Sequence, residues 1–104
     1  MLSEAEIDEV VEQIVARLRP QRVIVFGAYG KGTATEDSDL DVMAVVETDL
    51  PRAQRASGIP PYLPDSLVRL DLVVHTPEEV EELARDRFSL VSSALRRGRV
   101  VYEA

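Results

Sequence analysis

The sequence predicts one small α/β (α+β) domain, in which a single β-sheet of about four strands is covered by helices. Three observations carry this prediction. The chain has 104 residues, enough for one hydrophobic core. Its first segment repeats apolar residues at the helical period, and several short apolar strand-like runs follow, separated by turn-forming residues. We therefore expect residues 1–104 to form one domain, with any second substrate domain supplied by another chain.

The first segment predicts a helix over residues 4–19. Ser3 and Glu6 have the spacing of a capping box, and Pro20 prevents the helix from continuing. The apolar stripe consists of Ile7, Val10, Val11, Ile14, Val15 and Leu18. A short β-branched run, Arg22–Phe26, then predicts a buried strand that leads into a turn.

Residues 27–38 contain three glycines and no apolar period, which predicts a loop with at most one helical turn. Leu40–Val46 is apolar apart from Asp41 and predicts the second strand. Residues 48–66 hold four of the six prolines and predict a long connection, with a short helix around Arg52–Ala56.

Leu67–Val74 predicts a third strand. The next helix should begin after Thr76 as N-cap, with Pro77 at its first position and Glu79 completing a second capping box. Residues 87–97 predict another helix that Gly98 ends as its C′ residue, and Val100–Tyr102 should close the sheet.

The composition excludes several classes of protein. It is 45% hydrophobic and 30% charged, as expected of a folded globular chain. No apolar run approaches the roughly 20 residues that span a bilayer, and the N-terminus is acidic, so we expect a cytoplasmic protein without a membrane segment. With no cysteine and one histidine, His75, any metal must be bound through oxygen. His75 itself is interpreted as a bystander.

The net charge of −7 argues against general nucleic-acid binding, which depends on neutralising phosphates. Docking to a basic partner stays open. Eleven of the twelve basic residues are arginines, and a late group of them is interpreted as a solvated face. This group comprises Arg85, Arg87, Arg96, Arg97 and Arg99.

Three aspartates are candidates for metal-dependent chemistry. Asp39 and Asp41 lie two residues apart at the start of a strand, so both should point to one face, roughly 7 Å apart. Asp71 is the only acid inside the third strand, where a buried carboxylate costs several kcal/mol unless it is paired or metal-bound. The alternatives are a surface pair on an edge strand and a salt bridge from Asp71 to Arg22 or Arg69. Three converging carboxylates would suit one or two Mg²⁺ ions.

The glycine loop does not match the common nucleotide or calcium motifs. Thr33 occupies the lysine position of a Walker P-loop. The glycines run G-x-x-G-x-G, which is not the dinucleotide-binding order, and a strand follows them. Val42 stands where an EF-hand requires glycine.

The stretch from Val23 to Val42, VIVFGAYGKGTATEDSDLDV, resembles a known signature. It is similar to the Gly-Ser, ten residues, Asp-x-Asp pattern of the nucleotidyltransferases of the DNA polymerase beta-like superfamily, with ten residues between Ala28 and Asp39. The short chain, Asp71 and the ending RRGRVVYE resemble the minimal nucleotidyltransferase branch, so the resemblance covers nearly the whole chain.

This resemblance implies a nucleotidyltransferase fold with a mixed sheet, ATP as substrate, and Mg²⁺ or Mn²⁺ held by Asp39, Asp41 and Asp71 as the catalytic residues. The residues implied in nucleotide binding are Gly27, Ala28, Lys31 and Ser38. Ser38 could orient Asp39 or cap the loop. Tyr29 could stack on a base or pack in the core.

Two positions depart from the family pattern. Ala28 replaces the family serine, which removes a hydroxyl hydrogen bond to phosphate of about 1.5–3 kcal/mol, and Lys31 stands where arginine is frequent. Members of this branch are often antitoxins of HEPN–MNT toxin–antitoxin modules, some of which adenylylate a tyrosine of the helical HEPN partner.

Two functions follow as hypotheses. The first is transfer of AMP from ATP to a hydroxyl of a protein partner, and the second is a binding antitoxin that neutralises its toxin by occlusion. Nucleotide transfer to an aminoglycoside is disfavoured, because no part of the chain is left to form a drug-binding domain.

Overall fold

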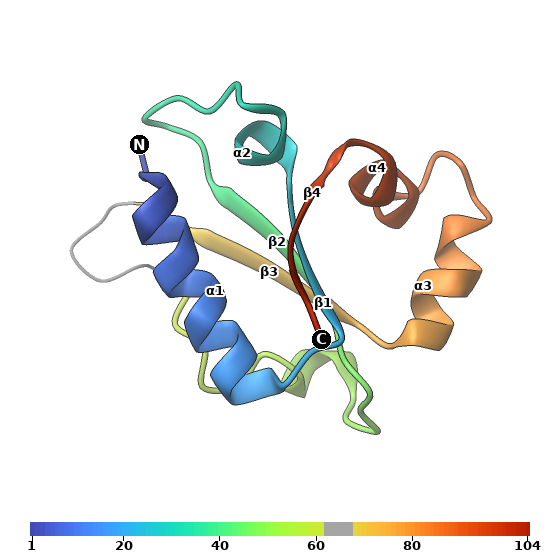
Figure 1. The fold of residues 1–104 in the computed structure, drawn as a ribbon. Helices are drawn as coiled ribbons and strands as arrows, with labels where there is room; N and C mark the ends of the chain where they lie inside the picture. The colour runs from blue at the N-terminus through green and yellow to red at the C-terminus, as the bar shows by residue number, and fades with distance from the viewer. Residues whose placement is uncertain (62–67) are drawn as a thin grey trace.

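The computed structural model describes residues 1–61 and 68–104, which form a four-stranded sheet with helices on both faces (Figure 1). The strand order is β3-β2-β1-β4. β1 pairs antiparallel with β2 and β4, whereas β2 pairs parallel with β3. The elements are α1 (Glu4–Leu18), β1 (Arg22–Phe26), α2 (Gly27–Lys31), β2 (Leu40–Val45), the 3₁₀ turn η1 (Arg52–Gln54), β3 (Leu70–His75), α3 (Pro77–Ala84), α4 (Leu90–Arg97) and β4 (Arg99–Glu103).

The predicted mixed sheet covered by helices is confirmed, and the element order matches along the described chain. Both capping boxes form: Ser3 Oγ accepts from the Glu6 amide at 3.2 Å, and Thr76 Oγ1 accepts from the Glu79 amide at 3.1 Å. Leu67, the predicted start of the third strand, and residues 62–66 of the long connection lie outside the described residues.

The prediction of a helix over residues 87–97 is wrong at its start. α4 begins at Leu90, because Ser89 acts as N-cap and its Oγ accepts from the Ser92 amide at 3.0 Å. The same hydroxyl donates to the carbonyl of Leu83 at 2.7 Å, which ties the start of α4 to the end of α3. A serine that is satisfied in this way favours a cap over a helix interior.

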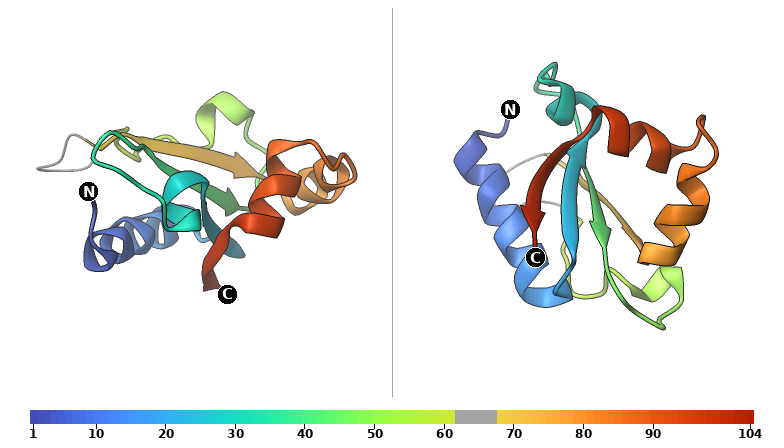
Figure 2. Two further views of the ribbon diagram at one scale, coloured as in Figure 1. Left: turned by 90° about the horizontal axis from the view of Figure 1, so that it is seen from above. Right: turned by 45° about the vertical axis from the view of Figure 1, so that its right-hand side comes forward.

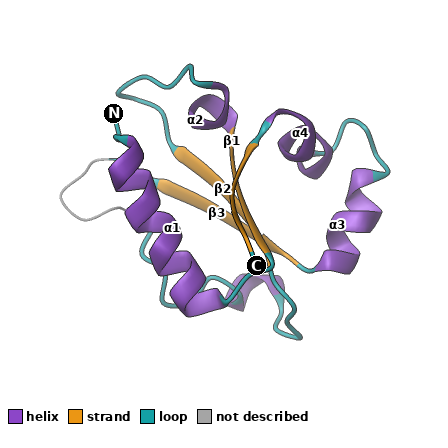
Figure 3. Cartoon of the chain, in the orientation of Figure 1, coloured by secondary structure: helices purple, strands orange, loops and turns teal. Residues whose placement is uncertain are grey.

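The side chains of the strands alternate between two hydrophobic layers, one on each face of the sheet. Figures 2 and 3 show the helices that cover the two faces. On β1, Val23 and Val25 pack against α1, whereas Ile24 and Phe26 pack against α3 and α4. β2 follows the same rule, because Val42 belongs to the α1 layer and Met43 to the α4 layer. Odd-numbered residues of β2 therefore face α4, and this places Asp41 on the α4 face of the sheet.

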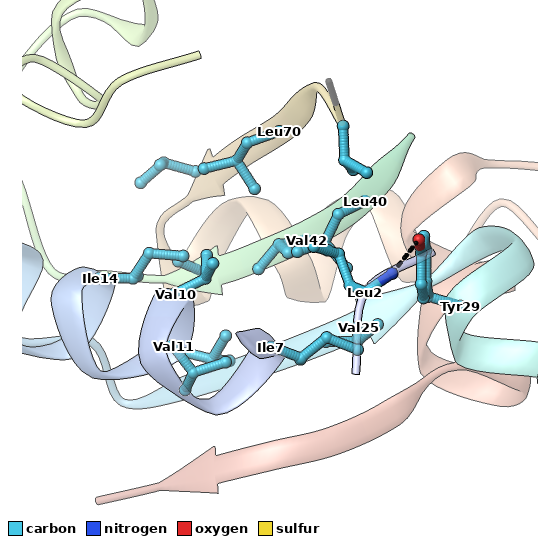
Figure 4. Close-up of a cluster of buried hydrophobic side chains, with 14 of the residues drawn as sticks. Leu2, Ile7, Val10, Val11, Ile14, Val25, Tyr29, Leu40, Val42 and Leu70 are labelled. Carbon is cyan, nitrogen blue, oxygen red and sulfur yellow. Dashed lines mark hydrogen bonds between the residues drawn. The ribbon is translucent and has the colours of Figure 1, made fainter. Parts of the chain in front are cut away.

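The α1 layer also contains Tyr29, which the sequence left open as a base-stacking residue. Tyr29 is 8% exposed, and its hydroxyl oxygen accepts a hydrogen bond from the Leu2 amide at 3.0 Å (Figure 4). Leu2 and Ile7 pack in the same cluster. Tyr29 is thus a core residue that holds the start of α1 against α2.

A partly buried ion pair anchors the long connection at the far end of β3. The Arg55 side chain is 9% exposed, and its Nη1 lies 2.6 Å from Glu79 Oε1 and donates to the Val74 carbonyl at 3.2 Å. The hydrogen bond from Arg55 is the main cause that lowers the pKa of Glu79 to about 2. His75 is buried beside this pair, with Nδ1 at 3.4 Å from Glu79 Oε1. These contacts join the long connection to the end of β3 and to the first turn of α3. The interpretation of His75 as a bystander stays a prediction.

Gly98 ends α4, as its C-cap and not as the predicted C′ residue. Its φ of −79° and ψ of 173° are extended, a conformation open to any residue. Glycine is needed here for space, because a β-carbon would lie 2.7 Å from Ile24 Cγ2 and 3.1 Å from the Val25 carbonyl oxygen. The chain therefore leaves α4 in close contact with β1 and continues directly into β4.

No helix in the described part of the chain is long and apolar enough to cross a membrane.

Candidate active site

Asp41 and Asp71 are direct neighbours across two strands. The parallel pairing of β2 and β3 sets Asp41 opposite Asp71, and the antiparallel pairing of β1 and β2 sets Asp41 opposite Phe26. The three residues form a row at the end of the sheet where β1 runs into α2. Both carboxylates lie on the face that α4 covers, because Val73, like Met43, is two residues further along its strand.

A cleft of about 290 Å³ opens over this row. α2 and α4 lie side by side above the end of the sheet and supply its other sides (Figure 2). The carboxylates therefore share the cleft with two cationic side chains and a hydroxyl. The lining residues are Phe26, Gly27, Lys31, Asp41, Asp71, Val73, Leu90, Ser93 and Arg97.

The carboxylates perturb one another. Partial burial is the first cause that raises the pKa of Asp41, and the negative charges of Asp71 and Asp39 and a side-chain hydrogen bond with Asp71 raise it further. Asp41 is half-buried, whereas Asp71 is exposed. The predicted burial of Asp71 is therefore wrong, because β3 is an edge strand and Asp71 stands at the open side of the cleft.

The two structural alternatives for the acids find little support. Asp41 lies on β2, which is an interior strand, so it does not belong to an edge-strand surface pair. Within the described ranges, no salt bridge involves Asp71, so neither Arg22 nor Arg69 neutralises it. The pair of carboxylates is left facing a cleft.

The two carboxylates fit a hard divalent cation whose remaining coordination positions are filled by a substrate. Among the residues that the structure describes, no three acidic or histidine side chains are grouped so that they could hold a metal ion by themselves. Mg²⁺ commonly takes only one or two protein carboxylates and fills its other positions with water and substrate phosphates. Asp41 and Asp71 meet that requirement. Asp39 does not line the cleft, and its role as a third ligand stays a prediction.

The predicted nucleotide-binding residues divide into two groups. Gly27 and Lys31 line the cleft, and Ala28 and Ser38 do not. Ser38 Oγ accepts from the Thr35 amide at 2.9 Å, and the Ser38 amide donates to the Thr35 carbonyl at 3.1 Å. Ser38 therefore caps the turn that leads into β2, which was one of its two expected roles.

Comparison with known proteins shows the family of the chain. The family model described as "Nucleotidyltransferase domain" matches residues 7–101. The chain belongs to this nucleotidyltransferase family. The matched region contains every residue that lines the cleft, from Phe26 to Arg97.

One curated relative and two solved structures are similar to this nucleotidyltransferase domain. The chain is 28% identical over 106 residues to a candidate protein adenylyltransferase of Methanocaldococcus jannaschii, and the match covers 98% of this chain and 100% of that protein. A candidate nucleotidyltransferase of Sulfolobus solfataricus has the same fold, with a TM-score of 0.62, 16% identity, and coverage of 95% of this chain and 78% of the other. A toxin–antitoxin structure solved with AMP-PNP gives a TM-score of 0.55 at 21% identity, covering 99% and 75%.

Sequence reasoning missed the α4 side of the cleft. Arg97 was grouped with a solvated arginine face, yet it lines the cleft together with Leu90 and Ser93. The missed signal is their spacing, because residues three, four and seven apart share one side of a helix. Other members of that arginine group have structural contacts: Arg96 donates to the Ser92 and Arg87 carbonyls, and Arg99 pairs with Glu4 at 3.0 Å.

Proposed function

We propose that this nucleotidyltransferase transfers AMP from ATP to a hydroxyl group of a protein partner. The observation that carries the proposal is the pairing of Asp41 with Asp71 in a cleft that also contains Lys31 and Arg97. Acidic groups that bind a cation beside basic groups that bind phosphate are the arrangement a metal–triphosphate complex requires. The choice of ATP and of a protein acceptor is supported by the names of the relatives, one a candidate protein adenylyltransferase and another solved with AMP-PNP.

Each residue has a defined task in this proposal. Asp41 and Asp71 hold Mg²⁺ or Mn²⁺, with Asp39 as a further ligand from just before β2. When bound, the cation neutralises the triphosphate and favours deprotonation of the acceptor hydroxyl. Lys31 binds the phosphates by charge, since it lines the same cleft. Gly27 leaves room for the Asp41 carboxylate, and Ala28 and Ser38 shape the loop beside the nucleotide.

The reaction balances without a further reactant. The acceptor oxygen forms a bond to the α-phosphorus of ATP while the bond from that phosphorus to the α–β bridging oxygen breaks. The bridging oxygen leaves with the electron pair as part of pyrophosphate, and the hydroxyl proton passes to solvent. The residues of the cleft position the reactants and stabilise charge, which is the main protein contribution in phosphoryl transfer.

The biological setting that we propose is an antitoxin of a HEPN–MNT pair that modifies its helical toxin. The toxin–antitoxin neighbour, which aligns with 99% of this chain, supports that setting. A second candidate is an antitoxin that occludes its toxin without chemistry. The observation that favours it is Ala28, at the position where the family has a serine that contacts the triphosphate.

The test is an assay of AMP transfer. The protein is mixed with its genomic neighbour, ATP and Mg²⁺, and intact-mass spectrometry measures the mass of one AMP added to the neighbour. The proposal predicts modification that EDTA abolishes and that added Mg²⁺ or Mn²⁺ restores. Neutralisation of the neighbour without any added mass would support occlusion instead.

A further inference from the structure

The two helices that flank the cleft meet at a pair of glycines, Gly30 on α2 and Gly98 after α4. A β-carbon on Gly30 would lie 2.6 Å from the Val25 carbonyl oxygen and 3.7 Å from the Gly98 Cα. A β-carbon on Gly98 would lie 3.1 Å from the same carbonyl oxygen. Both backbones therefore pack on one carbonyl of β1, and at position 30 the distance leaves no room for a β-carbon.

Each glycine is joined to a basic residue of the cleft. Lys31 follows Gly30 in the chain, and Arg97 precedes Gly98. Consecutive Cα atoms are about 3.8 Å apart, so the glycine contact fixes where both basic residues leave the backbone. Both side chains line the cleft. The close contact of the two helices thus brings two positive charges, far apart in sequence, into one site.

The positive charges of Lys31 and Arg97 are not neutralised by ion pairs in the described part of the chain. A basic residue at the C-terminus of a helix also interacts favourably with the helix dipole, which would be a purely structural role. Arg96 has that position as well, but its guanidinium donates to the Ser92 and Arg87 carbonyls and does not line the cleft. Of these two arginines, Arg97 is the one that combines the helix end with the cleft.

We propose that Arg97 and Lys31 form a polyphosphate-binding subsite, which holds the β- and γ-phosphates of the nucleotide and then the pyrophosphate product. This inference rests on the proposed function and adds a residue from α4 to the site. The planar guanidinium of Arg97 can bind two phosphate oxygens at once, and the Lys31 ammonium adds a second charge. Ser93, one turn before Arg97 on α4, offers a hydroxyl to the same group. The subsite lies beside the carboxylates, so the cation and the phosphates have separate ligands.

Pyrophosphate in a buffer that contains EDTA is the appropriate probe, because it needs no divalent cation and no acceptor. Titration calorimetry at low ionic strength compares the wild type with Arg97→Gln, Arg97→Lys and Lys31→Gln. Arg85→Gln is the matched control, since Arg85 is 76% exposed and lies away from the cleft. We expect Arg97→Gln to weaken pyrophosphate binding by about 10- to 100-fold, Arg97→Lys to recover part of it, and Arg85→Gln to match the wild type.

Equal affinity of Arg97→Gln and the wild type would overturn the subsite, as would the absence of pyrophosphate binding by the wild type. The variant Asp41→Asn distinguishes a failure of the phosphate subsite from a failure of the proposed function. It should keep metal-free pyrophosphate binding, because it removes a negative charge near the subsite, yet lose the metal-dependent binding of ATP. If pyrophosphate binds as expected but no AMP transfer occurs in any assay, the subsite stands and the enzyme proposal falls.

Discussion

Gly27 lies so close to Asp41 that a β-carbon at position 27 would overlap the Oδ2 atom of that carboxylate. Gly27 also has a φ of +64°, which side chains rarely adopt. The first residue of α2 and the carboxylate on β2 are therefore mutually constrained. This contact explains why the residue directly after β1 is glycine, and it leads to the first prediction.

Gly27→Ala should displace the Asp41 carboxylate and reduce metal-dependent ATP binding at least tenfold. Gly32→Ala is the matched control, because Gly32 has a φ of +76° but nothing lies within 4 Å of the place that a β-carbon would occupy there. Both variants should lose about 1–3 kcal/mol of unfolding free energy from backbone strain. Titration calorimetry should show the loss of binding in Gly27→Ala alone, and equal binding by the two variants would contradict the constraint.

Asp41→Asn should raise the melting temperature of the metal-free protein at pH 7, while abolishing the stabilisation by Mg²⁺ and ATP. Burial and the neighbouring charges raise the pKa of Asp41 above its ordinary value of 3.8, so its ionised form destabilises the fold. That penalty is present above the raised pKa and disappears as the pH falls below 3.8. Thermal unfolding of the wild type and of Asp41→Asn from pH 3 to pH 7 tests whether ionised Asp41 destabilises the fold. A lower melting temperature of Asp41→Asn at pH 7 would contradict this effect.

Glu79→Gln should destabilise the fold by about 2 kcal/mol at pH 7, because it leaves the buried Arg55 without a counter-charge. Glutamine can retain the capping box, so the variant isolates the charge. The pKa of Glu79 is lowered from 4.5 to about 2, so its contribution is present above pH 4.5 and is lost as the pH falls towards 2. Urea unfolding measures the difference. Glu78→Gln, which changes an acid in the same first turn, should alter stability by less than about 0.5 kcal/mol.

Ala28→Ser should tighten ATP binding by about tenfold if only the family hydroxyl has been lost. Ala28 lies on α2 and is half-buried. It does not line the cleft itself, but it directly follows Gly27, which does. Calorimetric titration with ATP and Mg²⁺ measures the change, with the melting temperature as a control of the fold. Unchanged affinity would show that α2 does not hold the triphosphate through this position.

Local signals made much of the fold predictable. The capping boxes at Ser3 and Thr76 depend on residues three apart, and the alternation of β2 and β3 depends on the period of a strand. The faces of Asp41 and Asp71 followed from the same alternation. Their pairing did not, because the register of a parallel pair is set across the long connection and by the core, not by a turn.

The roles of Arg97 and Tyr29 could not be predicted from the sequence, because they depend on tertiary contacts. Arg97 looks like any arginine at a helix end until Gly98 is seen to pack on β1 beside Gly30. Tyr29 looks equally suited to a base and to the core until its hydroxyl meets the Leu2 amide. In both cases the partner is distant in sequence, and a pattern of residue types has no information about it.

Asp71→Asn is the most direct test of the central claim, that the carboxylate pair serves AMP transfer. Asp71 stands at the open side of the cleft, so the variant should still bind ATP through Asp41 while losing transfer to the partner by a factor of about 10² or more. The measurement is the rate at which mass spectrometry detects AMP on the protein encoded beside this one. If wild type and Asp71→Asn both leave that protein unmodified and both suppress its toxicity, the enzyme account is contradicted and occlusion takes its place.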